Sequence, residues 1–455
     1  MMNILYHHRT QGRGGEGVHI REIVTAFQEM GHQVTVISPP GVDPMSTGNP
    51  VARSNGNSGV YGTSGARVIS IRGIKKASGA VAASGVSARA GGVNRGTAAR
   101  KRAGAGGEKP ADEPAVPGGL KASIRRVLKW CARRAPQPVF ELLEVGYNAY
   151  AFAKLQGALR AKKYDAIYER YAFFCFAGAF LARWFKVPLI LEVNEISGIE
   201  RNRAQSFTRL TSWLERRILK RASAIMVVSS FLREELIKRG AAPDKIKIIP
   251  NAVNPDSFKP DTDCDEVRER YGLEDKFCIG FLGHFAHWDR LDLLIAAVKR
   301  LRAMHRNVHL LLVGDGNVRA ELEEQVRAEG LEDAVTFTGM VPHDQIPEFI
   351  QTFDLCVLPH SNPFGSPLVM FEFMAMAKAI MVPDVGPVLD VIVHDENGHV
   401  FSNGDVDEIV EGVKYLIDHP EERARLGANA RRTVEENYTW KDNARRVSRL
   451  FKAAS

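Results

Sequence analysis

Cysteines and long apolar runs are scarce in this 455-residue sequence, and each scarcity excludes a class of protein. The five cysteines are scattered, odd in number and without metal-ligand spacing, which argues against a disulfide framework and against a zinc module. No run of about 18 apolar residues exists, so no transmembrane helix is predicted. The N-terminus MMNILYHHRTQG also differs from a signal peptide. We therefore expect a cytoplasmic protein with reduced thiols.

Acidic residues are nearly absent from residues 51–110, which hold eleven Lys and Arg and a single acid, Glu108. This segment contributes 11 − 1 = +10 to a chain of net charge +8, so the remaining residues sum to 8 − 10 = −2. The basic character is local, and nucleic acid is not an expected partner. The segment is rich in Ala, Gly and Ser and lacks the apolar surface that offsets ordering entropy. We expect a disordered insertion over about 45–120, acting as a solvated tether or touching acidic lipid.

The rest of the sequence alternates strand and helix patterns. An apolar strand over 2–8 is followed by the turn GRGGEG, a helical pattern over 18–30 and a second strand over 31–38. This order is typical of a βαβ unit and a parallel sheet. After the insertion we expect basic amphipathic helices over 120–134 and 139–162, and then further apolar strands. Residues 250–264 are rich in Pro, Asn and Asp and predict a linker before a second α/β series.

The fold class expected is therefore α/β, with two doubly wound Rossmann-like domains facing a cleft. The domains predicted are 1–255 and 265–436, with a last helix over 437–455 that crosses back to the first domain or packs on the second. Ligands in such folds bind beyond the carboxyl ends of the strands.

The most informative segment is LPHSNPFGSPLVMFEFMAMAKAIMV, residues 358–382. It predicts a strand end, a Gly/Pro/Ser-rich turn and a helix that opens at Ser366 and carries one carboxylate, Glu372. A helix N-terminus offers unpaired N–H groups to a phosphate, and a glutamate almost two turns in can accept bonds from sugar hydroxyls. The segment predicts a nucleotide-sugar site, although a capped amphipathic helix with a surface glutamate explains it equally well.

Several segments in order resemble glycosyltransferase family 4, the retaining nucleotide-sugar enzymes of the GT-B fold. They are ILYHHRTQGRGGEGVHIREI, YDAIYERYAFFCFAGAFLA, VPLILEVNEI, IKIIPNAVNPDSF, LLLVGDGNVRAELE and SPLVMFEFMAMAKAIMV. The similarity covers the chain apart from about 45–120. It implies a C-terminal domain that binds the nucleotide sugar and an N-terminal domain that binds the acceptor, a glycan or a lipid-linked sugar of bacterial cell-surface polysaccharide synthesis.

The resemblance also implies roles for individual residues of the C-terminal domain. Glu372 matches the family glutamate that holds the nucleotide ribose. Backbone amides near the helix start match those that receive the diphosphate, and they belong to Gly365, Ser366, Leu368 and Val369. Pro367 has no N–H to contribute.

In the N-terminal domain, Gly14 and Gly15 match the glycine loop that approaches the donor phosphates and the acceptor. Asn194 lies where many family members have a histidine near the reacting sugar. An amide can donate and accept hydrogen bonds, but it cannot take up a proton.

Several positions depart from the family pattern. His284 stands where the family has a diphosphate-binding Arg, and either Asp289 or Arg290 stands where it has a Lys. Phe364 replaces a glutamate that contacts the donor sugar, and Val369 replaces a Lys of the helix start. The cationic contacts to the leaving diphosphate are thus fewer than usual.

The expected function is retaining transfer of a hexose from a nucleotide diphospho-sugar, without a metal or other cofactor. Two alternatives stay open: a catalytically weak homologue that acts as a binding or scaffold partner, and a nucleotide-sugar epimerase of the same fold. A hydrolase that uses Glu192 and Glu195 is a further, less favoured interpretation. The basic helix over 209–221 is expected either to lie peripherally on the inner face of the cytoplasmic membrane or to be an ordinary solvated face.

Overall fold

A computed structural model describes residues 1–10, 14–43, 45, 67–68, 137–199, 205–304 and 307–454. All of them belong to one compact unit formed by Met1–Ser70 and Gln137–Ser455. The insertion over about 45–120, for which the sequence predicts disorder, and the helix expected over 120–134 lie outside the described residues, apart from Met45 and the two-residue strand at 67–68. No helix among the described residues is long and apolar enough to cross a bilayer.

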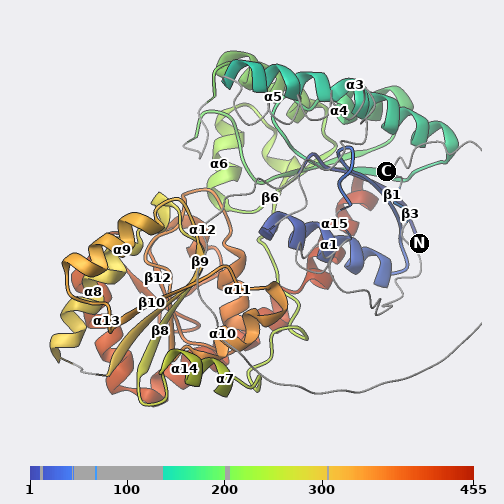
Figure 1. The fold of residues 1–455 in the computed structure, drawn as a ribbon. Coiled ribbons are helices and arrows are strands. Elements are labelled where there is room, and N and C mark those ends of the chain that lie inside the picture. The colour runs from blue at the N-terminus through green and yellow to red at the C-terminus, as the bar shows by residue number, and fades with distance from the viewer. Residues whose placement is uncertain are drawn as a thin grey trace, which may run out of the picture. The chain divides into compact units, whose positions relative to one another are not determined.

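The N-terminal half forms a seven-stranded parallel sheet in the order β3-β2-β1-β4-β5-β6-β7 (Figure 1). Its elements are β1 (Asn3–His7), α1 (Gly14–Glu29), β2 (Gln33–Ile37), β3 (Arg67–Val68), α3 (Gln137–Ala161), β4 (Ala166–Arg170), α4 (Ala177–Phe185), β5 (Leu189–Val193), α5 (Thr208–Arg221), β6 (Ala224–Val227), α6 (Ser230–Lys238), a 3-10 turn (Pro243–Lys245) and β7 (Ile246–Ile248).

The C-terminal half forms a six-stranded parallel sheet in the order β10-β9-β8-β11-β12-β13. Its helices are α7 (Asp265–Tyr271), α8 (Leu291–Met304), α9 (Arg319–Ala328), α10 (Ile346–Thr352), α11 (Leu368–Ala375), α12 (Gly386–Leu389), α13 (Val406–Asp418) and α14 (Pro420–Asn437). Its strands are β8 (Phe277–His284), β9 (Val308–Asp315), β10 (Val335–Gly339), β11 (Leu355–Val357), β12 (Ile380–Pro383) and β13 (His399–Phe401), and 3-10 turns lie at His287–Asp289 and His343–Gln345. The prediction of two doubly wound parallel sheets is confirmed.

Both faces of the N-terminal sheet are buried because successive strand residues point to opposite sides. On β1, Leu5 joins the core formed with α3, α4, α5 and α6. Its neighbours Ile4 and Tyr6 join a second core, formed with α1 and the last helix, α15 (Trp440–Ala454). A strand buried on both faces has the near-continuous apolar sequence that predicted it.

Helix α15 therefore belongs to the core of the N-terminal half, although the C-terminal series precedes it. Trp440, Ala444, Val447 and Phe451 are buried in this core. The ring of Phe451 lies 5.8 Å from that of Phe27. The side-chain amide of Asn443 donates to the carbonyl of Pro250 at 2.7 Å. The C-terminus of the chain thus covers one face of the first sheet.

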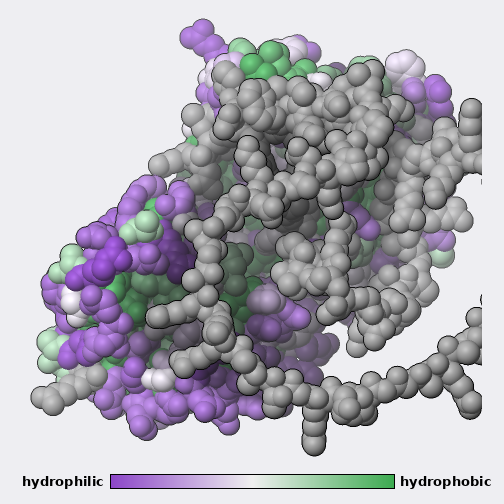
Figure 2. Space-filling view, in the orientation of Figure 1, coloured by the Kyte–Doolittle hydropathy of each residue, from purple (hydrophilic) through white to green (hydrophobic). Residues whose placement is uncertain are grey.

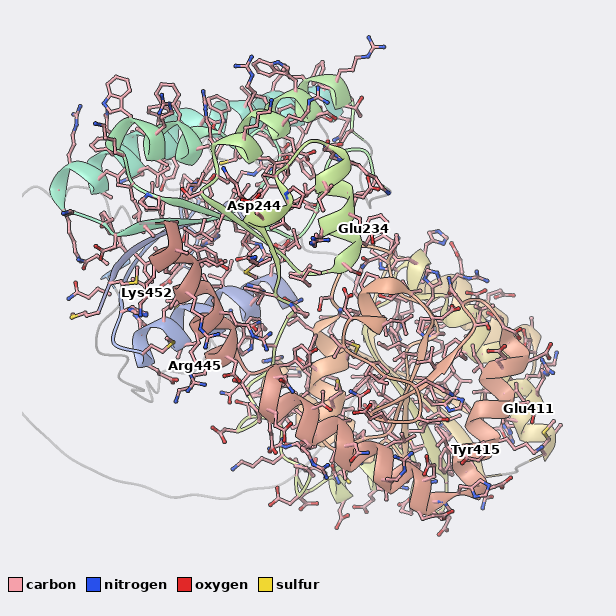
Figure 3. The ribbon with its side chains drawn as sticks, turned by 180° about the vertical axis from the view of Figure 1, so that it is seen from behind. Glu234, Asp244, Glu411, Tyr415, Arg445 and Lys452 are labelled. Carbon is pink, nitrogen blue, oxygen red and sulfur yellow. The ribbon has the colours of Figure 1, made fainter. Side chains whose placement is uncertain are left out.

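Replacing Phe451 with Ala is expected to destabilise the N-terminal half by about 3–5 kcal/mol, because it removes a fully buried ring and leaves a cavity. Urea unfolding followed by far-ultraviolet circular dichroism measures this effect. Lys452→Ala is the matched control, since Lys452 is exposed on the same helix (Figure 3). Equal unfolding midpoints for the two variants would contradict the packing of α15.

Candidate active site

The helix predicted to open at Ser366 begins at Leu368, with Pro367 as its N-cap residue. Pro367 has an extended backbone (φ −64°, ψ 119°), and no side chain of the described residues caps this end. Since a helix start without a cap leaves backbone N–H groups unsatisfied, the amides of Leu368 and Val369 can receive an anion. The helix start lies two residues later than the sequence suggested, because the proline ends the extended segment before it.

Ser366 is held by a residue from the far end of the N-terminal series. The backbone N–H of Asn251 donates to Ser366 Oγ at 3.1 Å, and Asn251 Nδ2 donates to the Ser366 carbonyl at 2.6 Å. Ser366 is buried, and its hydroxyl hydrogen remains available for a ligand. The next amide, that of Gly365, donates to Asn362 Oδ1 and is thus already used. A phosphate would therefore have to displace Asn362 Oδ1 to bind the Gly365 amide, which is one of the predicted phosphate contacts.

Glu372 lies in the second turn of α11 and is half-buried. Its carboxylate has no hydrogen bond or ion pair with any other described residue, whereas buried carboxylates normally have partners. Burial raises the pKa of Glu372 to about 7. An unpartnered, partly desolvated carboxylate is suited to accept bonds from ligand hydroxyl groups.

His284, the last residue of β8, and Arg290, in the loop that follows, stand at or beside the positions where the family has diphosphate-binding cations. His284 is exposed at the end of the strand, and Arg290 is exposed in a left-handed conformation (φ +47°). The Arg290 guanidinium is paired with both carboxylate oxygens of Asp292, at 2.9 Å each. Asp289 accepts a bond from the Ala286 amide at 3.0 Å, and burial raises the pKa of Asp289 to about 7. This pair uses the Arg290 Nε and Nη2 atoms, so Nη1 can still donate to a diphosphate, but the Asp292 carboxylate offsets much of the positive charge.

The imidazole of His360 ties this loop to the segment before α11, through a bond from Nδ1 to the carbonyl of Trp288. Sequence reasoning missed this contact, although His360 belongs to the segment LPHSN that was singled out. The bond connects two segments predicted to face the same ligand.

The glycine loop meets the start of α11. Gly14 begins α1 with a left-handed backbone (φ +58°), which favours glycine. A Cβ atom on Gly15 would lie only 2.9 Å from Leu368 Cδ1. Leu368 packs on the core that includes α1. The structure thus brings together Gly15 and Leu368, which the sequence separates by more than 350 residues.

His19 continues the chain of polar contacts from Asn251 into the N-terminal sheet. Since Asn251 Nδ2 is used by Ser366, its Oδ1 faces His19 Nδ1 at 3.0 Å, so this nitrogen carries a hydrogen. The other ring nitrogen lies 3.2 Å from Glu192 Oε1 at ion-pair distance. One ring nitrogen is therefore hydrogen-bonded to Asn251, and the other faces the Glu192 carboxylate without a hydrogen bond among the described residues. Sequence reasoning missed His19, whose only signal is its place in the glycine-loop motif.

Glu192 is fully buried and accepts bonds at Oε1 from Arg170 Nη1 and Asn194 Nδ2, each at 2.6 Å. Burial alone would raise the pKa of Glu192, but His19 and Arg170 outweigh it and hold this pKa well below its usual range. A lowered pKa favours the ionised form of Glu192, which does not suit the role of general acid in a hydrolase. Its bond to Asn194 Nδ2 turns Asn194 Oδ1 outward as an acceptor, without a partner among the described residues.

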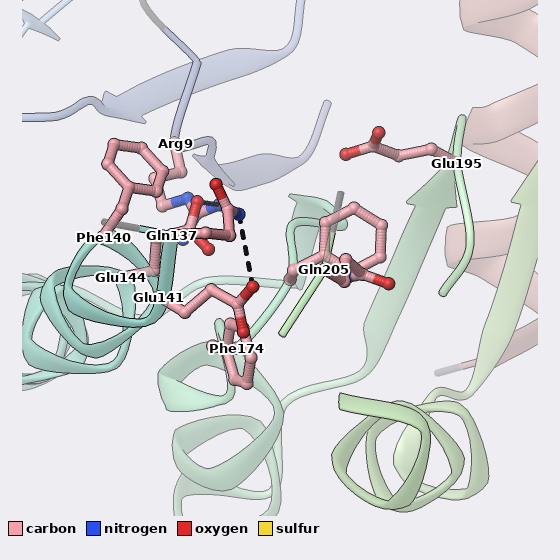
Figure 4. A pocket seen from close by; sticks show the side chains of 9 residues that line it. Arg9, Gln137, Phe140, Glu141, Glu144, Phe174, Glu195 and Gln205 are labelled. Atoms are coloured by element: carbon pink, nitrogen blue, oxygen red, sulfur yellow. Dashed lines mark hydrogen bonds and ion pairs between the residues drawn. The ribbon is translucent and has the colours of Figure 1, made fainter. Parts of the chain in front are cut away.

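A pocket lies beyond the carboxyl ends of β1, β4 and β5 (Figure 4). Its lining includes Arg9, Phe140, Glu141, Glu144, Phe174 and Glu195. Arg9 pairs with Glu144 at 2.8 Å. The Glu141 carboxylate accepts bonds from the backbone amides of Ser206 at 2.6 Å and Phe207 at 2.9 Å, at the start of α5. Aromatic faces beside charged and amide groups are suited to a polyhydroxyl ligand.

Two histidine-containing clusters among the described residues have metal-ligand spacing. In the first, His7 Nδ1 lies 2.7 Å from Glu169 and Nε2 lies 3.2 Å from the Tyr147 hydroxyl, so both nitrogens are used. In the second, His394 Nδ1 accepts a bond from the Val400 amide, which leaves the ring hydrogen on Nε2, the atom that faces Asp395. Neither cluster offers three available ligand atoms.

Two sequence-family models match nearly the whole of the chain outside its linker and C-terminal helix. One, described as a glycosyl transferase 4-like domain, matches residues 14–252, and the other, glycosyl transferases group 1, matches residues 263–433. The chain belongs to the glycosyltransferase 4-like family. The resemblance drawn from the sequence motifs is thereby confirmed.

Curated relatives of this glycosyltransferase include α-D-kanosaminyltransferase of Streptomyces kanamyceticus, 30% identical over 55% of the chain and 66% of the relative. An uncharacterised glycosyltransferase of Methanocaldococcus jannaschii is 27% identical over 68% of the chain and 80% of the relative. The aligned part of the chain thus spans just under two thirds of the length of the kanosaminyltransferase.

Solved structures share the GT-B fold of the glycosyltransferase. Anabaena HepE, crystallised with UDP and glucose, matches with a TM-score of 0.65 and 17% identity over 100% of both chains. Sucrose-phosphate synthase of Thermosynechococcus elongatus matches with a TM-score of 0.63 and 17% identity, also over 100% of both chains.

Glu372→Gln is expected to stabilise the unliganded protein at pH 8 and to leave its stability unchanged at pH 4. Folding raises the pKa of Glu372 above the unfolded value. The contribution of the protonated side chain to the free energy of unfolding is therefore fully present below about pH 4.5, and it is lost as the pH rises through about 7. The difference in unfolding free energy at pH 8 should be on the order of 1–3 kcal/mol. Thermal midpoints at both pH values measure it, and a pH-independent difference would contradict the burial of the carboxylate.

Glu192→Gln is expected to destabilise the N-terminal half by about 3–5 kcal/mol, because Arg170 would keep a buried charge without a carboxylate partner. The matched control is Glu234→Gln, the same chemical change at an exposed position of α6 (Figure 3). Urea unfolding compares the two variants. A loss below about 1 kcal/mol for Glu192→Gln, as at the exposed site, would show that the buried pairs are not formed.

Proposed function

We propose that the protein transfers a hexose, with retention of configuration, from a nucleotide diphospho-sugar to a hydroxyl group of a glycan or lipid-linked acceptor. The observation that carries the proposal is Glu372, a carboxylate without a described partner in the second turn of a helix whose N-terminus is uncapped. Phosphate at the helix start and hydroxyl groups at the carboxylate are the two chemistries that a nucleotide sugar combines.

In this proposal the diphosphate binds the amides of Leu368 and Val369 and the hydroxyl of Ser366, and Glu372 accepts bonds from the ribose. His284 and Arg290 stand beyond β8 for the remaining phosphate contacts. Since Arg290 is shared with Asp292, the helix start has to supply much of the binding. Charge on the leaving phosphate grows in the transition state, so the same groups affect both affinity and rate.

The reaction needs no protein base in the mechanism that the family resemblance implies. The bond between the sugar C1 and the diphosphate oxygen breaks, the acceptor oxygen bonds to C1 on the same face, and its proton passes to the leaving phosphate. Asn194 Oδ1, oriented by Glu192, accepts a hydrogen bond from a sugar hydroxyl group. This role requires an acceptor atom and no proton uptake, which an amide can provide.

The acceptor is proposed to bind at the Arg9 pocket, beyond the carboxyl ends of the N-terminal strands. Two relatives support a sugar-containing or lipid-linked acceptor. One is a 2-deoxystreptamine glucosyltransferase, and the other is a phosphatidylinositol monomannoside mannosyltransferase. The HepE structure contains UDP and glucose. We further propose that the reaction takes place on the cytoplasmic side, serves the synthesis of bacterial cell-surface polysaccharide and uses no metal cofactor.

The pairing of Arg290 with Asp292 favours one alternative, a weakly catalytic homologue that binds nucleotide without efficient transfer. Binding without turnover of any nucleotide sugar would support it. Interconversion of two nucleotide sugars in the absence of an acceptor would indicate an epimerase instead.

Calorimetric titration with UDP, GDP and ADP, together with slow hydrolysis of the corresponding nucleotide sugars, tests the proposal. Glu372→Ala is expected to weaken nucleotide binding by about 10- to 100-fold, since a hydrogen bond to a charged group contributes about 1.5–3 kcal/mol. Glu411→Ala, at an exposed glutamate of α13 (Figure 3), is the control and should bind as the unmodified protein does.

Asn194→Ala in the same assay is expected to lower the hydrolysis rate and to leave nucleotide affinity unchanged. Failure of the protein to bind any nucleoside diphosphate would overturn the enzymatic proposal. Unchanged affinity in Glu372→Ala would overturn the placement of the ribose.

A further inference from the structure

Exposed apolar side chains are concentrated on three helices of the N-terminal half. Fifteen large hydrophobic residues are exposed in the described part of the chain, and eight of them lie on α3, α4 or α5 or directly before α5. These eight are Val139, Leu142, Leu143, Phe180, Trp184, Phe207, Leu210 and Trp213. We call the surface that they form the α3–α5 surface. A concentration of this kind on a globular protein marks an interaction site.

Helix α3 contributes an outer stripe without charge. Its exposed residues from position 138 to 157 are all apolar or small, and the first exposed charged residue of the helix is Arg160. The stripe consists of Pro138, Val139, Leu142, Leu143, Gly146, Ala149, Ala153 and Gly157. A solvent-facing helix of this length, about 37 Å for 25 residues, normally carries charged residues on its outer face. Water is thus not the expected neighbour of this stripe.

Helix α5 contributes a face that combines aromatic and cationic groups. Leu210 and Trp213 are exposed among five exposed basic residues, namely Arg209, Arg216, Arg217, Lys220 and Arg221. The guanidinium of Arg217 lies 4.8 Å from the centre of the Trp213 ring. The one acidic residue of the helix, Glu215, is buried and paired with Arg239 at 2.7 Å. Figure 2 shows hydrophobic and hydrophilic atoms side by side at the top of the view, where α5 lies in Figure 1.

Contacts between the helices make the surface continuous. The Glu141 side chain bonds to the amides of Ser206 and Phe207, which places the start of α3 beside the start of α5. Phe152 of α3 lies 5.4 Å from Phe180 of α4, ring centre to ring centre. Phe180 in turn lies 6.0 Å from Trp184, which is 69% exposed.

We propose that the α3–α5 surface binds the anionic face of a lipid bilayer. Tryptophan and phenylalanine side chains favour the boundary between lipid headgroups and acyl chains, and the uncharged stripe of α3 can enter it without desolvating a charge. The basic residues of α5 match the negative potential of an anionic leaflet. A protein partner would explain the apolar residues, but the exposed basic residues of the same helix, which pair with no acidic side chain among the described residues, favour lipid.

Membrane binding would hold the acceptor pocket near a lipid-linked acceptor. In this respect alone it rests on the proposed function. Glu141 belongs both to the lining of that pocket and to the contact between α3 and α5. The pocket and the surface therefore share the first turns of α3.

Co-sedimentation of the full chain with vesicles tests the proposal. We expect binding to vesicles of phosphatidylcholine mixed with phosphatidylglycerol, much weaker binding to phosphatidylcholine alone, and loss of binding at high salt. Trp184→Ser with Trp213→Ser, and separately Arg216→Glu with Arg217→Glu, should each weaken binding at least tenfold. The matched controls are Met340→Ser and Arg432→Glu, which change exposed residues of the C-terminal half and should bind as the unmodified protein does.

Thermal midpoints and nucleotide affinity, measured for every variant, establish that the protein remains folded. Vesicle binding that survives both double substitutions, for example through the basic segment 51–110, would overturn the proposal. Equal binding to both vesicle types would overturn the anionic specificity. If the protein does not bind vesicles but forms a dimer that the tryptophan substitutions dissociate, the partner of this surface is a second copy of the chain. Vesicle binding without nucleotide binding would refute the proposed function alone.

Discussion

A buried carboxylate must be paired, and Glu192 shows how much of this structure depends on that requirement. It is surrounded by Arg170, His19 and Asn194, each of which comes from a different part of the N-terminal sequence. Desolvating one carboxylate alone would be very costly, so these groups are held together as a set. The set also fixes their hydrogen-bond directions, which leaves the oxygen of Asn194 as an acceptor.

The same set reaches the start of α11 through Asn251. The side-chain amide of Asn251 contacts both His19 and Ser366. Its oxygen accepts from His19 Nδ1, and its nitrogen donates to the Ser366 carbonyl. The residue that orients Asn194 and the residue proposed to hold phosphate are therefore joined by one series of polar contacts, in which His19 and Glu192 meet at ion-pair distance. Substitution of an inner member of this series, His19 or Asn251, is expected to affect both ends, whereas substitution of Asn194 at its end affects that end alone.

Sequence motifs predicted the parallel sheets and the segment that contains Glu372, because apolar strand runs and Gly/Pro-rich turns are local signals. They placed the helix start at Ser366, whereas Pro367 delays it to Leu368. They also could not predict that the Gly365 amide is used by Asn362 or that Arg290 is paired with Asp292. Such pairings depend on side-chain geometry, which composition and spacing do not encode.

The sequence by itself determined the alternation of strands and helices, the concentration of basic residues in 51–110, and the Gly/Pro-rich turn before a helix that carries one glutamate. These features depend on residues close together in the chain. Only the tertiary structure decided that α15 completes the first core, that His19 lies between Glu192 and Asn251, and that α3, α4 and α5 share one apolar and basic surface. Those features join residues far apart in sequence, and burial and hydrogen-bond geometry between them exist only after the chain has folded.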